Sequence, residues 1–174
     1  SVPPEPLGET KTDEEGLFEF DFESVDGDIL LEVIGDQGGN AIEPVTGTSP
    51  IPLSQDDWLA TLVVATKLGE TRSDAAINPW STLVTARTLA EIRGGMGVRD
   101  AWQKNNGLFS AHFGTATPWN APSIDLLGNA APGVDSGTLY SLGVYSLSQH
   151  ALMLGKRAGV TDVSIVNSLT LLRL

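Results

Sequence analysis

Apolar and polar residues alternate along residues 17–23, which read LFEFDFE. Phenylalanines fall on one side of an extended chain there, and carboxylates fall on the other. These two sets are Phe18, Phe20 and Phe22, and Glu19, Asp21 and Glu23. A period of two predicts a strand with one buried face and one acidic face. Two more apolar runs predict strands, ILLEVIG at 29–35 and WLATLVVAT at 58–66. Because the second run alternates poorly, we expect it to be buried on both faces.

The hydrophobic period becomes helical after residue 77. In NPWSTLVTARTLAEIRGG, Asn78 is the expected N-cap and Pro79 the first helical residue. The glycine pair at 94–95 would end this helix. Similar patterns predict helices over Val98–Phe113, over about Thr138–Gly155, and from Asp162 onward. The apolar face of the last helix would carry Ile165, Val166, Leu169 and Leu172.

Strands that precede helices in this way predict an α+β fold. We expect an N-terminal antiparallel β-sandwich-like unit over residues 1–77 and a small α-helical bundle over residues 78–174. A full sandwich has further strands before residue 9, so the expected sandwich is incomplete. Its open edges would accept a strand from a neighbouring copy.

Charge is divided unevenly between the two units. The chain of 174 residues has a formal net charge of −12. Fifteen of its 22 Asp and Glu residues lie within residues 1–57, with one lysine and no arginine. Such an acidic segment repels phosphate backbones, which argues against a nucleic-acid partner. No stretch approaches the roughly 20 apolar residues of a transmembrane helix, so none is predicted.

Catalytic motifs are absent from the sequence. It contains no cysteine, which excludes thiolate nucleophiles and thiolate zinc sites. Of the two histidines, His150 lies two residues from Ser148, and residues so spaced on a helix do not face each other. No G-x-S-x-G, H-E-x-x-H, G-x-G-x-x-G or P-loop motif occurs. We therefore predict that the chain is not an enzyme and needs no cofactor, with calcium as the one alternative.

The segment TDEEGLF resembles carboxypeptidase-regulatory-like, or transthyretin-like, β-sandwich modules of bacterial surface proteins. Thr12, Asp13, Gly16 and Phe18 match T-D-x-x-G-x-F, and ILLEVIG looks like the following strand. The stretches NPWSTL (78–83), HFG (112–114) and YSLSQHAL (145–152) resemble the helical region that follows such modules. The resemblance implies a sandwich followed by helices, in a bacterial protein that is secreted or displayed on the cell surface.

Three sets of residues are candidates for binding. The acidic set would bind calcium through clustered carboxylates, the alternative being a solvated face; it comprises Asp13, Glu15, Glu19, Asp21, Asp26 and Asp28. Trp119, in TPWNAP, would stack on a ligand such as a sugar. Assembly would join an acidic strand face to a basic surface. This third set comprises Glu19, Asp21 and Glu23 with Arg87, Arg93 and Arg99.

Two functions remain open at this point. The first is a non-enzymatic structural or adhesion module, extracellular or on the cell surface, that self-assembles into a fibre through its sheet edges. Its partners would be copies of itself or other parts of a larger surface protein. The alternative is a calcium- or carbohydrate-binding accessory domain of a larger secreted protein.

Overall fold

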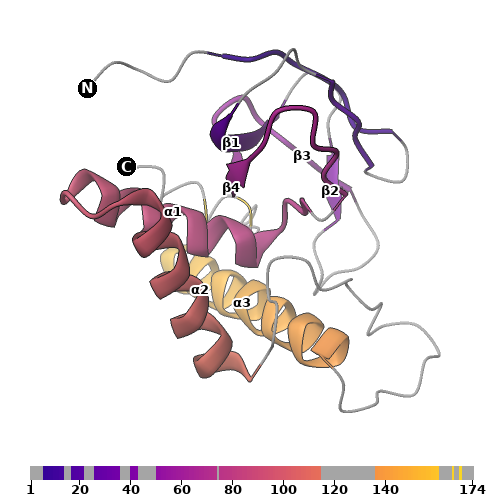
Figure 1. Cartoon of the computed structure of the whole chain (residues 1–174). Helices are drawn as coiled ribbons and strands as arrows, with labels where there is room; N and C mark the ends of the chain where they lie inside the picture. The colour runs from indigo at the N-terminus through magenta and orange to yellow at the C-terminus, as the bar shows by residue number, and fades with distance from the viewer. Residues whose placement is uncertain are drawn as a thin grey trace.

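The computed structural model describes residues 6–13, 17–21, 26–35, 40–42, 50–73, 75–114, 136–160, 166 and 169. Four strands precede three helices in these residues (Figure 1). The elements are β1 (Gly27–Ile34), β2 (Asn40–Ile42), β3 (Pro50–Pro52), β4 (Trp58–Thr66), α1 (Pro79–Arg93), α2 (Val98–Phe113) and α3 (Ser136–Ala158).

The longer sheet pairs β1 with β4 in antiparallel register, with Leu31 opposite Thr61. The register shifts between Gly27 and Ile29. At this irregularity Ala65 adopts a left-handed φ of 59°, and its N–H donates to Asp28 Oδ1 at 2.9 Å. A second, shorter sheet pairs β2 with β3. The strands predicted at 29–35 and 58–66 are therefore confirmed as β1 and β4.

The predicted β-sandwich is wrong. The described residues form two separate two-stranded sheets, and residues 17–21 are not a strand. Phe18 and Phe20 are half-buried, and Asp13 is joined to Leu17 by two hydrogen bonds. The α+β class and the helical part are as expected. The layer that covers β4 consists of α1 and α2, whereas a sandwich would place a second sheet there.

The helices follow local signals in the sequence. The Asn78 side chain accepts the Ser81 N–H at 2.8 Å, and Ser81 Oγ accepts the Asn78 N–H at 2.9 Å, which forms a capping box. The predicted bounds of α2 are confirmed, and Gly114 follows it with φ 69°. The third helix extends a few residues beyond its predicted ends. The segment predicted as a fourth helix lies largely outside the described residues, although Val166 and Leu169 are helical and buried.

The hydrophobic core surrounds Trp80 of α1. Trp80 packs with a group of buried residues that comprises Tyr140, Val144, Val166 and Leu169. The ring centroid of Phe113 lies 4.2 Å from that of Trp80, and Trp80 Nε1 donates to the Tyr140 carbonyl oxygen at 3.2 Å. A Cβ atom added at Gly143 of α3 would overlap the Trp80 ring. The absence of a side chain at residue 143 therefore lets α3 approach α1 closely.

Polar side chains share the interior with this core. The described residues include twelve buried apolar and twelve buried polar or charged side chains. α1 contributes Ser81, Thr82, Thr85 and Thr88. On α2, the fully buried Asn105 donates through Nδ2 to the Ala101 carbonyl oxygen at 2.9 Å, and its Oδ1 has no partner among the described residues.

The proposed boundary between residues 77 and 78 coincides with the start of α1, and the division into two domains stays a prediction. Contacts cross this boundary. Leu59 of β4 packs against the Trp80 core, and Trp102 of α2 donates to a carbonyl oxygen of β4. In the described residues, the strands and helices thus share one core.

Candidate functional site

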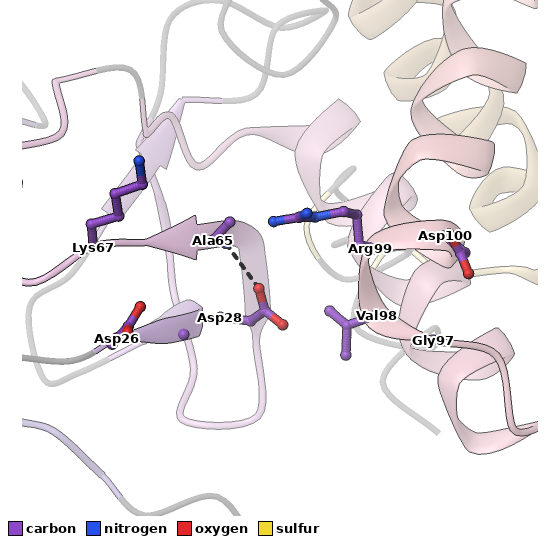
Figure 2. Close-up of a pocket in the computed structure, with 9 residues that line it drawn as sticks. Asp26, Asp28, Ala65, Lys67, Gly97, Val98, Arg99 and Asp100 are labelled. Atoms are coloured by element: carbon purple, nitrogen blue, oxygen red, sulfur yellow. Dashed lines mark hydrogen bonds between the residues drawn. The ribbon is translucent and has the colours of Figure 1, made fainter.

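An open pocket of about 600 Å³ lies where the irregular end of the β1–β4 sheet faces the start of α2. We call it the sheet-end pocket; its lining comprises Asp26, Gly27, Asp28, Ala65, Lys67, Gly97, Val98, Arg99 and Asp100. Figure 2 shows Arg99 extending from α2 toward Ala65 at the end of β4, with Asp28 on the neighbouring strand.

The sheet-end pocket mixes opposite charges. Asp26 and Asp28 come from the sheet side, Arg99 and Asp100 come from α2, and Lys67 follows β4. One carboxylate oxygen of Asp28 already accepts a hydrogen bond from the Ala65 N–H, which leaves less of this carboxylate available to a ligand. The lining residues offer no nucleophile beside a general base. The pocket is an open surface hollow whose lining residues are mostly charged or small.

The pocket joins members of two predicted sets. Asp26 and Asp28 belong to the predicted calcium set, and Arg99 belongs to the predicted assembly set. Asp13, Glu19 and Asp21 are exposed in the segment that precedes β1. Glu15 and Glu23 lie outside the described residues, as does Trp119. Within the described part of the chain, no three His, Asp or Glu side chains are grouped to hold a metal ion. The calcium site and the Trp119 ligand site stay predictions.

The predicted basic surface is only partly available to a partner. Arg87 Nε lies 4.0 Å from Glu91 Oε1, and Lys104 Nζ lies 2.8 Å from the same oxygen. The hydrogen bond from Lys104 is the largest of several contributions that outweigh desolvation and hold the pKa of Glu91 below its ordinary value. Arg93, at the end of α1, and Arg99 are exposed. The assembly surface stays a prediction.

The outer edge of β4 is covered by helix side chains, which sequence reasoning missed. The Ala60 N–H donates to Thr82 Oγ1 at 3.0 Å, and Ser81 Oγ donates to the Ala60 carbonyl oxygen at 2.9 Å. Trp102 Nε1 donates to the Leu62 carbonyl oxygen at 3.1 Å. These side chains take the place of a neighbouring strand. The only sequence signal was the polar Ser-Thr pair on the first turn of an otherwise amphipathic helix.

The outer edge of β1 contrasts with that of β4. Among the described residues no strand pairs with β1 on the side away from β4. The helices pack mainly against β4, which lies between β1 and α1 in Figure 1. Glu32 is exposed, and Ile34 is 51% exposed, whereas Ala60 and Leu62 on β4 are buried. Within the β1–β4 sheet, the outer edge of β1 is therefore the edge that no described strand or helix side chain covers through hydrogen bonds.

Comparison with known proteins gives no relative for this chain. No family model matches, and neither the curated proteins nor the solved structures include a significant match. Among the described residues, no helix is both long and apolar enough to cross a membrane.

Proposed function

We propose that this chain is a non-enzymatic structural or adhesion module, extracellular or on the cell surface, that associates with copies of itself. The observation that carries the proposal is that, among the described residues, no strand pairs with the outer edge of β1, whereas helix side chains cover the outer edge of β4. An open edge presents a row of unpaired backbone donors and acceptors, to which another chain can add a strand. The bacterial extracellular setting rests on the resemblance of TDEEGLF and the segments after it to surface modules, although the described residues do not form the β-sandwich of those modules.

The side chains along β1 support the proposal in two ways. Ile34 is a large apolar residue that is half exposed on an edge strand, so strand addition there would remove apolar surface from water. Natural edge strands that avoid association instead carry inward-pointing charges, prolines or bulges. In β1, the exposed Asp28 and the register irregularity lie at the start of the strand, and the remaining residues, 29–34, carry one charged residue and no proline. By contrast, two of the three residues of β3 are prolines.

Sedimentation velocity of the chain over a range of concentrations, at low and high salt, tests the proposal. We expect a species heavier than the 18.3 kDa monomer, with a population that rises with concentration. Its salt dependence reports whether the acidic and basic sets take part, because screening weakens exposed charge pairs. A monomer at every concentration would contradict the proposal.

The variant Ile34→Lys tests whether self-association depends on the β1 edge. A lysine on the edge should shift the species toward monomer, since charge there opposes strand addition. Leu68→Lys is the matched control, because it makes the same charge change at a 67% exposed leucine in the turn after β4. We expect Leu68→Lys to sediment like the unchanged chain. Equal effects of both variants would assign the change to net charge and overturn the role of the edge.

A further inference from the structure

We infer that two copies of this chain pair through β1 in antiparallel register about Leu31, which forms a closed dimer. The inference rests on the proposed function, because it specifies how the copies meet. In this dimer, the β1 strand of one copy pairs with the outer edge of β1 on the other copy. Three features of the described residues support it: the direction of the backbone groups on β1, the positions of its charges, and the covered edge of β4.

The backbone direction on β1 follows from Ala60. Its N–H and C=O both bond to α1 side chains, so they point away from β1. Glu32 lies directly opposite Ala60, which makes this a non-hydrogen-bonded pair, and the N–H and C=O of Glu32 also point outward. Because the direction of the backbone groups alternates along a strand, the N–H and C=O groups of Leu30 and Ile34 point outward as well. Leu30, Glu32 and Ile34 thus present backbone donors and acceptors to a partner strand.

The charges on β1 disfavour both registers next to the one about Leu31. With Leu31 opposite Leu31 of the second copy, Leu30 faces Glu32 and Asp28 faces Ile34, so no acid lies directly opposite an acid. A register centred on Glu32 would place two Glu32 carboxylates opposite each other. A register centred on Leu30 would oppose Asp28 and Glu32. Like charges directly opposite are destabilising across a sheet, which favours the register about Leu31.

The covered edge of β4 closes the β1–β4 sheet at two copies. Antiparallel pairing of β1 with itself uses the same surface on both copies, so it is a two-fold contact that closes. The resulting four-stranded sheet would run β4–β1–β1–β4. At both of its outer edges, side chains of Ser81, Thr82 and Trp102 already occupy backbone groups of β4. A fibre needs two open edges on each copy, and the β1–β4 sheet offers one.

Disulfide cross-linking tests the register, because the chain has no cysteine of its own. In the variant Leu31→Cys, the two residues form a non-hydrogen-bonded pair with Cα atoms about 4.5 Å apart, within reach of a disulfide. We expect mild oxidation to give a covalent dimer on a non-reducing gel. Val33→Cys is the matched control. Its two copies would lie about 13 Å apart along the strands and should stay unlinked.

A mixture of Ile29→Cys and Val33→Cys chains tests the same register with Leu31 intact. These residues face each other across the dimer, so we expect a disulfide between the two different chains.

Sedimentation of the unchanged chain separates the two proposals. A monomer in solution overturns both. Two results would overturn the antiparallel dimer and leave the proposed function standing. In the first, the chain self-associates but neither Leu31→Cys nor the mixed chains form a disulfide. In the second, Val33→Cys alone forms a disulfide as readily as Leu31→Cys. Species larger than the dimer overturn closure.

Discussion

Trp80 and Gly143 are in contact through the bare backbone of α3, where a Cβ atom would overlap the indole ring. The variant Gly143→Ala must push α3 away from the core or displace Trp80, which is 2% exposed. We expect a loss of about 1–3 kcal/mol in the free energy of unfolding, as is typical of overpacked cores. Urea denaturation measures it.

Gly107→Ala supplies the matched control. Gly107 lies within α2, and a Cβ atom there would meet nothing within 4 Å. Alanine at a free helical position should raise stability by about 0.5–1 kcal/mol, because glycine is a poor helix former. If Gly143→Ala lowers the free energy of unfolding and Gly107→Ala raises it, the close approach of α3 to Trp80 contributes to stability. A neutral Gly143→Ala would show that α3 relaxes without cost.

Thr82→Val tests the cover on the β4 edge. Valine keeps the shape of threonine and removes Oγ1, which accepts the Ala60 N–H and donates to the Asn78 carbonyl oxygen at 2.8 Å. Leaving a buried N–H without a partner should cost about 1–3 kcal/mol in thermal or urea unfolding. Thr82→Ser keeps the hydroxyl and should lose clearly less. If serine costs as much as valine, packing of the methyl group matters more than the hydrogen bond.

The stability contributed by Glu91 should depend on pH. Its pKa in the folded chain is below the ordinary 4.5, chiefly because Lys104 donates a hydrogen bond to it. The charged carboxylate is thus preferred in the folded state, and its contribution is present above pH 4.5 and is lost as pH falls through the lower folded pKa. Glu91→Gln should have a lower melting temperature than the unchanged chain at pH 7.

That difference in melting temperature should be smaller at an acid pH below the folded pKa of Glu91 than at pH 7. Glu19→Gln, at an exposed carboxylate, serves as the control and should change the melting temperature little at either pH. A gap between Glu91→Gln and the unchanged chain that persists in acid would instead point to the Glu91–Asn105 hydrogen bond, which spans 3.2 Å, as a neutral contact.

The calcium alternative predicts that millimolar calcium raises the melting temperature, because a ligand that binds only the folded chain stabilises it. Asp28→Asn should reduce the rise, since Asp28 and Asp26 are the predicted ligands that share one pocket. Magnesium at equal concentration controls for general screening. A melting temperature that calcium leaves unchanged excludes this alternative.

Local signals could be read from the sequence, and non-local ones could not. The N-cap at Asn78 and the bounds of α2 depend on residues a few positions apart, so they were predictable. The hydrogen bonds that join Thr82 and Trp102 to the backbone of β4 span 22 and 40 residues. No pattern along the chain shows that helices, and not a second sheet, would cover β4. The alternation at residues 17–21 also misled, because a period of two does not supply a pairing strand.

The even mixture of polar and apolar side chains in the interior has a thermodynamic consequence. Exposing apolar surface raises the heat capacity on unfolding, and exposing polar surface lowers it. With twelve buried polar side chains beside twelve apolar ones in the described residues, unfolding should show a smaller heat-capacity change than a purely apolar core of this size would give. A smaller change flattens the stability curve. The fold should therefore lose stability more slowly on cooling than a fold with a purely apolar core of this size.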